Sequence, residues 1–215
     1  VLPPDFGFFL DLSHRMHPAV CAPVSKLSYE GRLHSLPSDR SLEGVPPGLH
    51  PVPVLAHNNS TSSAEEADAV LAIVRDTVGR AWTSAGSTAP LAPDNVIVVA
   101  PYNAQVQLLR ETLDAAGFER VPVGTVDRFQ GREAAVAIVS LAASSAADVP
   151  RGLEFLLLAN RLNVAISRAQ WAAWLLYSPG ITESLPTSIT ALAQLSAFIT
   201  LVEPGGYSGE LQSRR

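Results

Sequence analysis

The chain has 215 residues, of which 47% are hydrophobic and 16% are charged. This much apolar sequence can bury a sizeable core, which excludes disorder as the main state. The net charge of -5 argues against a protein that holds nucleic acid by bulk electrostatics alone, although local basic clusters can still do so. The single cysteine, Cys21, excludes an internal disulfide framework and a thiolate metal site, so we expect a reducing, cytoplasmic setting.

The only lysine of the chain, Lys26, is followed by Leu27, so the sequence contains no G-x-x-x-x-G-K-[ST] phosphate loop. The chain is therefore not expected to be a complete ATPase of that class. Its only methionine is Met16, and we expect the chain to be a piece of a longer polypeptide. No apolar stretch is long enough for a membrane span and no signal segment opens the chain, so no membrane partner is expected.

In chain order, the first predicted strand covers residues 51–56. A capping box at 63–66 then opens a helix with one apolar side. The proline- and glycine-containing residues 32–50 are predicted to form a loop, as are residues 83–94 and 144–152. The last dozen residues, rich in Gly and Ser, are predicted to be a loose tail.

Residues 90–177 alternate short apolar runs with helical patterns, which is typical of βαβ units. Asn103 is expected to cap a helix that stops at Gly117. The sequence therefore predicts an α/β fold with a parallel sheet and helices on both faces. The strands expected in this part are residues 95–100, 121–126, 135–141 and 171–177.

Three polar segments interrupt this pattern, at positions where a parallel sheet places ligands: residues 13–18, 124–133 and 160–169. If Asn160 caps a helix, Arg161 and Arg168 lie about 700° apart and project from nearly the same face. Two unneutralised guanidinium groups on one face favour a phosphate-bearing partner. The alternative is that Arg168 complements a helix C-terminus while Arg161 is solvated.

The second segment carries Gly131, which lets backbone N–H groups approach an anion, between the polar side chains of Gln130 and Glu133. On its own it is equally consistent with a polar surface turn.

In the first segment, His14 and His17 have the spacing of a metal pair, but no third ligand is evident, so we expect a capped, partly buried histidine and no metal site. The chain has no G-x-S-x-G elbow and no G-x-G-x-x-G loop, which leaves hydrolase and dehydrogenase interpretations unsupported.

Together, in this order and spacing, the segments resemble the second motor domain of superfamily 1 helicases of group B, the nonsense-decay-type branch. The family pattern Q-Y-R-M-H-P corresponds to Ser13–Pro18, and A-P-Y-x-A-Q corresponds to Ala100–Gln105. The pattern V-G-T-V-D-x-F-Q-G-R-E corresponds to Val123–Glu133, and R-L-N-V-A-x-[ST]-R-A corresponds without interruption to Arg161–Ala169.

The resemblance implies a RecA-like α/β domain that forms one wall of an ATP cleft. The phosphate loop and the Mg²⁺-binding carboxylates would then lie on the first RecA-like domain of the same polypeptide. By resemblance, Arg15 and Arg168 reach the γ-phosphate as arginine fingers. Gly131 and Glu133 would contact phosphate and ribose, and Gln130 would help to couple the nucleotide to the bound strand.

The same resemblance assigns Arg161 to the ATP site. It also places His14 where the family usually has a tyrosine that stacks on adenine. Tyr102, Asn103 and Thr125 would face a single strand of DNA or RNA.

The implied function is half of an ATP-dependent helicase or translocase that is inactive alone. The alternative is a degenerate helicase-like scaffold module. A fused nuclease domain in the parent would fit the family's habit of fusion. We expect residues 1–50 to pack on a helicase domain formed by residues 51–202, with a flexible tail over residues 203–215.

Overall fold

The centre of the molecule is a five-stranded sheet in the order β4-β10-β9-β7-β8, and every pair of neighbouring strands in it is parallel. The computed structural model describes residues 9–129, 131–186 and 188–203. The strands of the central sheet are β4 (Gly48–Pro53), β7 (Val96–Val99), β8 (Val123–Gly124), β9 (Ala134–Ser140) and β10 (Ala169–Tyr177).

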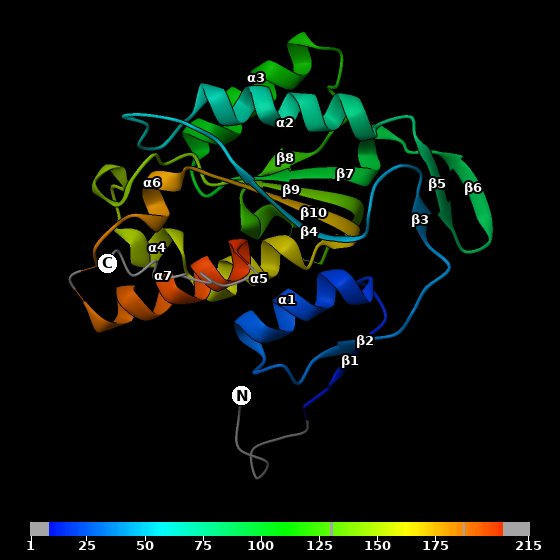
Figure 1. The fold of residues 1–215 in the computed structure, drawn as a ribbon. Helices are drawn as coiled ribbons and strands as arrows, with labels where there is room; N and C mark the ends of the chain where they lie inside the picture. Colours follow the sequence, from blue (N-terminus) through cyan, green and yellow to red (C-terminus); the bar gives the residue numbers. More distant parts are fainter. Residues whose placement is uncertain (1–8, 130, 187, 204–215) are drawn as a thin grey trace, which may run out of the picture.

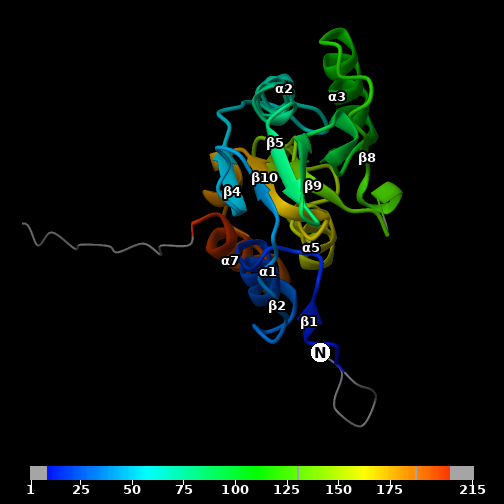
Figure 2. The same ribbon diagram turned by 90° about the vertical axis from the view of Figure 1, so that its right-hand side faces the viewer.

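Helices cover both faces of this sheet (Figures 1 and 2). On one face lie α2 (Ala64–Thr77) and α3 (Asn103–Ala115). On the other lie α1 (Pro18–Ser28), α4 (Leu153–Leu156), α5 (Ala159–Ile166) and α7 (Ile189–Val202), with the short α6 (Pro179–Thr182) beside α4. The α/β class predicted from the sequence is thus confirmed, as a RecA-like parallel sheet with helices on both faces.

The two faces divide the core because successive strand residues point to opposite sides. In β9, Val136 and Ile138 join the cluster that contains the apolar sides of α2 and α3. Ala137 and Val139 join the cluster that contains α1, α5 and α7. All seven residues of β9 are buried, as expected for a central parallel strand, and this rigid layer fixes the loops that follow it.

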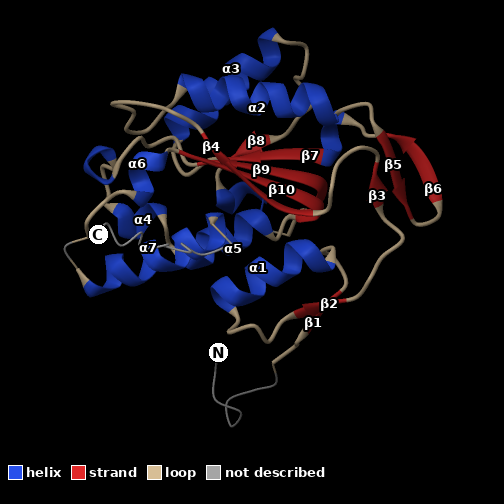
Figure 3. Cartoon of the chain, viewed as in Figure 1, coloured by secondary structure: helices blue, strands red, loops and turns tan. Residues whose placement is uncertain are grey.

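Two small sheets flank the main one (Figure 3). Strands β1 (Leu12–Ser13) and β2 (His34–Ser35) pair in parallel, and β3 (Ser41–Leu42), β5 (Ala81–Ser84) and β6 (Ser87–Pro90) form an antiparallel sheet. The prediction of a loop over residues 83–94 is therefore wrong. Ala85 and Gly86 both have positive φ, the conformation of a type I′ hairpin turn. The predicted loop over residues 32–50 likewise contains β2 and β3.

Other boundaries differ from the predictions for local reasons. The strand expected at 121–126 shortens to β8, because Pro122 has no N–H to donate and a 3₁₀ turn (Val126–Phe129) begins directly afterwards. The strand expected at 51–56 is β4, which begins and ends earlier. The predicted loop over 144–152 contains one 3₁₀ turn, Ala146–Asp148. Apart from Glu203, the predicted tail lies outside the described residues.

Across the described helices, none combines the length and the apolar character needed to cross a membrane.

The capping box at α2 forms only in part. The Ser63 hydroxyl accepts a hydrogen bond from the Glu66 backbone N–H at 3.1 Å, as predicted. The Glu66 side chain does not return to Ser63. It is fully buried and accepts hydrogen bonds from Ser140 (2.6 Å) and from the Ala142 N–H (3.0 Å). Burial raises the pKa of Glu66 to about 7. Its acceptor contacts hold the end of β9, where Ala142 has a φ of 69°.

Candidate functional site

Helix α5 separates two cavities and presents a different side to each. Arg161, Leu162 and Ala165 line one cavity, whereas Asn163 and Val164 line the other. The α5 N-cap is Leu158, not Asn160, because the Leu158 carbonyl accepts the N–H of Arg161 at 2.9 Å and that of Leu162 at 3.2 Å. The helix stops at Ile166, so Arg168 lies beyond it. The prediction that Arg161 and Arg168 share a helix face is wrong for this reason.

The cavity lined by Asn163 and Val164, called here the Arg15 pocket, has a volume of about 340 Å³. Ser13, His14 and Arg15 enter it from β1 and the turn that follows, and Ser167 and Arg168 enter it from the end of α5. The structure therefore brings together the two arginines that the sequence singled out. Because they come from segments more than 150 residues apart, the fold rather than a local motif creates this pocket.

Arg168 is 8% exposed and holds three backbone carbonyls. Its Nε donates to Val164 O at 2.8 Å, and its Nη1 donates to Arg132 O at 3.2 Å and to Phe129 O at 3.4 Å. Among the described residues Nη2 has no hydrogen-bond partner. Burial, and secondarily the nearby Arg15 charge, lower the pKa of Arg168. Arg168 therefore connects the turn around Gly131 to α5 through its Nε and Nη1 groups.

Glu133 reaches Arg15 directly. The Arg15 Nε donates to Glu133 Oε2 at 2.9 Å, and both side chains are more than one-third exposed. Gly131 turns the chain beside them with a φ of 83°, a conformation that favours glycine. The predicted site residue Gln130 lies outside the described residues.

The two histidines of the first segment have different surroundings. His17 caps α1, since its Nδ1 accepts the Ala19 N–H at 3.1 Å, and its ring meets Trp171 edge-on at 4.9 Å. Burial lowers the pKa of His17, and its backbone N–H donates to Gln170 O at 2.8 Å. His14 is exposed and lines the Arg15 pocket. Among the described residues no three His, Cys, Asp or Glu side chains are grouped so that they could hold a metal ion.

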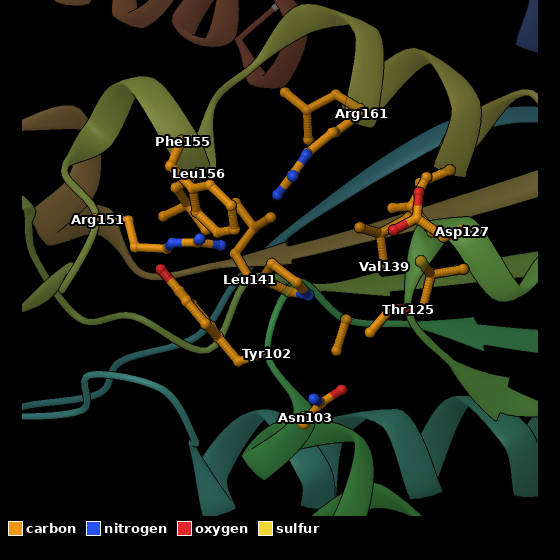
Figure 4. A pocket seen from close by; sticks show the side chains of 16 residues that line it. Tyr102, Asn103, Thr125, Asp127, Val139, Leu141, Arg151, Phe155, Leu156 and Arg161 are labelled. Carbon is orange, nitrogen blue, oxygen red and sulfur yellow. The ribbon is translucent and has the colours of Figure 1, made fainter.

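The cavity lined by Arg161, Leu162 and Ala165, called here the Tyr102 pocket, has a volume of about 360 Å³. It lies at the carboxyl ends of β7 and β9 (Figure 4). It contains Tyr102, Asn103 and Thr125, the residues predicted to face a strand. Tyr102 is the N-cap of α3 and Asn103 its first residue, because the Tyr102 backbone is extended and its carbonyl accepts the Val106 N–H. The prediction of Asn103 as the cap is wrong by one residue.

Arg161 belongs to the Tyr102 pocket. Its guanidinium carbon lies 4.1 Å from the centre of the Phe155 ring, and that of Arg151 lies 4.5 Å from the same centre. The Tyr102 ring lies 5.8 Å from Phe155. Figure 4 shows these side chains gathered along one side of the cavity. The expectation that Arg161 lines the same site as Arg15 and Arg168 is thus not met, because α5 stands between them.

Sequence reasoning missed Arg151, Phe155 and Asn163. Phe155 sits on the four-residue helix α4, which is too short to show a periodic pattern, and Arg151 precedes it in a turn. Asn163 lies inside the R-L-N-V-A motif, so a signal was present. Its Nδ2 donates to the Tyr29 hydroxyl at 3.0 Å, while its Oδ1 is buried in the wall of the Arg15 pocket without a partner among the described residues.

Comparison with known proteins identifies the family. Residues 4–179 match the family model described as "AAA domain", so the chain belongs to that family. The resemblance to superfamily 1 helicases drawn from the motifs is confirmed as well.

Three relatives illustrate the similarity. The chain is 49% identical over 80 residues to the DNA polymerase alpha-associated DNA helicase A of Schizosaccharomyces pombe, covering 37% of this chain and 12% of the relative. It is 31% identical over 147 residues to the DNA replication ATP-dependent helicase/nuclease DNA2 of Mus musculus, covering 68% and 13%. It is 27% identical over 209 residues to the regulator of nonsense transcripts 1 of Dictyostelium discoideum, covering 90% and 15%.

The chain thus spans less than one-fifth of the length of each of these relatives. Among solved structures, it is similar to the C-terminal domain of a possible DNA helicase from Lactobacillus plantarum WCFS1. That similarity has a TM-score of 0.44 and 15% identity, and it covers 83% of this chain and 92% of the other.

Proposed function

We propose that this chain is the second motor domain of an ATP-dependent helicase or translocase that moves on single-stranded nucleic acid. The observation that carries the proposal is the position of α5 between two cavities that have different chemistry. One cavity receives Arg15 and Arg168, and the other receives Tyr102, Asn103 and Thr125. A single rigid helix can then transmit closure around a nucleotide to a strand held on its other side.

In this proposal the Arg15 pocket binds the triphosphate end of ATP. Arg15 and Arg168 stabilise the charge that develops on the γ-phosphoryl group, an effect of about 10³ to 10⁵ in rate where such arginines have been assigned. Glu133, which now contacts Arg15, would exchange that contact for a ribose hydroxyl. Gly131 would keep the backbone close to the phosphates, and His14 would contact the base.

The phosphate loop and the Mg²⁺ ligands belong, in this proposal, to the first RecA-like domain of the same polypeptide. The side chains described here fit that division, since they supply guanidinium groups and no cluster of carboxylates. Bound Mg²⁺ would neutralise phosphate charge. The isolated chain would therefore lack turnover.

Tyr102, Asn103 and Thr125 would contact the sugar-phosphate backbone of a DNA or RNA strand. Their hydroxyl and amide groups suit such contacts, and a tyrosine can also stack on a base. The resemblance implies 5′ to 3′ movement. A nuclease domain on the parent polypeptide is a further proposal, which the similarity to the mouse helicase/nuclease supports.

The test compares ATP hydrolysis by the 215-residue chain with hydrolysis by its parent polypeptide, each with and without an oligonucleotide. We expect no turnover by the chain and strand-stimulated turnover by the parent. Gln130→Ala in the parent should remove the strand stimulation while ATP still binds. Turnover by the isolated chain, or none by the parent, contradicts the proposal.

A second candidate is a helicase-like scaffold that has lost motor function. His14, at the position of an adenine-stacking tyrosine, is the observation that favours it. The intact grouping of Arg15, Glu133 and Arg168 opposes it, because a decayed site has no need to keep these contacts. An inactive parent that still binds an oligonucleotide would support the scaffold.

A further inference from the structure

The Tyr102 pocket contains a group of side chains to which neither the motif resemblance nor the relatives assign a strand contact. Arg151 and Arg161 both stack on Phe155, with guanidinium carbons 4.5 Å and 4.1 Å from the ring centre. Cation–π contacts of this kind hold a guanidinium in place without using its N–H donors. The ring therefore orients two positive charges whose guanidinium N–H groups make no hydrogen bond among the described residues.

These charges are not neutralised locally. Neither Arg151 nor Arg161 forms an ion pair with an acid among the described residues, whereas Arg15, Arg80, Arg110 and Arg120 each do. Asp127 is the one carboxylate that lines the pocket, and it makes no ion pair with either arginine. Two guanidinium groups against one carboxylate leave this pocket with an excess of positive charge, although the chain as a whole carries -5.

A third group lies beside them. Tyr102 is 9% exposed, and its hydroxyl is buried without a hydrogen-bond partner among the described residues. Burial raises the pKa of this hydroxyl, so it is a neutral donor. Buried hydroxyl groups are normally paired, and an unpaired one at the wall of a cavity indicates a ligand that accepts a hydrogen bond there.

Two sources of phosphate are available to this protein: the nucleotide and the strand. The nucleotide arginines, Arg15 and Arg168, lie in the other cavity, on the far side of α5. Arg161 shares its cavity with Asn103 and Thr125, which the motif resemblance assigns to the strand. The position in the fold therefore favours the strand.

We propose that Arg151, Phe155 and Arg161 form a clamp for the phosphodiester backbone of a single strand, with the Tyr102 hydroxyl donating to the same ligand. This rests on the proposed function, since it presumes that a strand binds at the carboxyl ends of β7 and β9. It moves Arg161 from the ATP site to the strand site and adds Arg151 and Phe155 to the strand site. Phe155 acts as a positioning residue, and the two arginines contact the ligand.

The test measures fluorescence anisotropy of a labelled oligothymidylate of about 12 nucleotides against the 215-residue chain, between about 50 and 200 mM salt. Arg151→Ala and Arg161→Ala should each weaken binding about tenfold, as expected for loss of a charge-assisted hydrogen bond. Each should also reduce the slope of log K against log salt by about 0.7. Phe155→Leu keeps both charges, so it should weaken binding less and leave the slope unchanged.

Arg75→Ala is the matched control, because Arg75 is an exposed arginine on α2 that does not line the pocket. It should bind like the unmodified chain. Circular dichroism and urea midpoints verify folding, and Arg161→Lys provides a second variant that keeps the charge but loses the planar fork. Binding of a fluorescent ATP analogue to the parent polypeptide, which also carries the phosphate loop, should be the same with and without Arg161→Ala.

Unchanged oligonucleotide affinity in all the clamp variants overturns the clamp and leaves strand binding by the domain intact. Loss of ATP-analogue binding by Arg161→Ala with full oligonucleotide affinity also overturns it and returns Arg161 to the nucleotide. If the unmodified chain fails to bind the oligonucleotide at low salt, the strand-binding half of the proposed function fails together with the clamp.

Discussion

The Arg15 pocket and the Tyr102 pocket lie on two sides of α5. Each is supported by a buried ionisable side chain, which is an arginine at the Arg15 pocket and a glutamate at the Tyr102 pocket. Arg168 shapes the Arg15 pocket by donating to three backbone carbonyls around the Gly131 turn and α5. Glu66 shapes the Tyr102 pocket from behind, by accepting the Ala142 N–H and the Ser140 hydroxyl at the end of β9. Arg168 also faces its cavity, whereas Glu66 does not.

This difference indicates how each pocket responds to its surroundings. An arginine stays charged across the physiological range, so Arg168 supports the Arg15 pocket with the same charge throughout that range. The pKa of Glu66 is raised to about 7, so the support behind the Tyr102 pocket changes charge near neutrality. Removing either support should therefore affect one pocket and leave the other unchanged.

Replacing Arg168 by Met should destabilise the chain by about 3 to 5 kcal/mol, because it removes three hydrogen bonds made by a buried charged donor and leaves the Arg132 carbonyl without a donor among the described residues. Urea unfolding measures the total. Hydrogen exchange should show faster exchange at residues 131–134 and unchanged protection in α3. Equal loosening of α3 would mean that the two pockets are not supported independently.

Glu66→Gln should change how stability depends on pH. In the unmodified chain the folded-state pKa of Glu66 exceeds its ordinary value of 4.5, so folding retains a proton that the unfolded chain releases. Stability therefore falls as pH rises from about 4.5 to about 7, by about 3 kcal/mol, and the penalty persists at higher pH. The nearby Glu65 charge contributes a smaller part of the rise in the Glu66 pKa.

Glu66→Gln should remove most of the fall in stability between about pH 4.5 and about pH 7, because glutamine does not titrate. Urea unfolding at several pH values measures this. Glu65→Gln is the matched control, since the Glu65 side chain is exposed and its pKa is lowered mainly by local hydrogen bonds. A profile for Glu66→Gln that still falls between pH 4.5 and 7 would contradict the role of Glu66.

Tyr102→Phe should have opposite effects on stability and on binding. Removing a buried, unpartnered hydroxyl should leave the free energy of unfolding unchanged or raise it by about 1 kcal/mol. The same change should weaken oligonucleotide binding by about three- to tenfold. Thermal unfolding and anisotropy measure the two quantities. Reduced stability with unchanged binding would indicate a structural role for the hydroxyl.

The smallest effect is expected for the ion pair of Arg15 and Glu133. Both side chains are more than one-third exposed, so Glu133→Gln should cost less than about 1 kcal/mol, and less again at high salt. Urea unfolding at two salt concentrations measures it. A large, salt-independent loss would mean that this pair supports the fold and is not free to open for a ligand.

The elements with strong patterns were predictable from the sequence. The apolar runs of β7, β9 and β10 place these strands within two residues of their observed ends, because a fully buried parallel strand leaves an unbroken apolar run. The grouping of these motif residues was predictable as well, since Arg15 and Arg168 line one pocket and Tyr102 and Thr125 line the other, while their roles stay predictions.

What failed depends on where helices stop and on tertiary contacts. Arg161 and Arg168 share a face only if α5 continues past Ile166, and nothing local in the sequence marks that end. Phe155 lies on a single helical turn, which has no period to detect. The sequence predicts that the Glu66 side chain completes a capping box. Its carboxylate instead accepts hydrogen bonds from the buried Ser140 hydroxyl and the Ala142 N–H, which are distant in sequence.

If α5 keeps nucleotide and strand contacts apart, Arg161→Ala and Arg168→Ala should have different effects on strand-dependent ATP hydrolysis by the parent polypeptide. For Arg168→Ala we predict turnover at saturating strand lowered about 10³-fold or more, with strand affinity retained. For Arg161→Ala we predict about tenfold more strand needed for half-maximal rate, with saturated turnover retained. If both variants lose saturated turnover equally and keep full strand affinity, the two arginines serve one site and the account is contradicted.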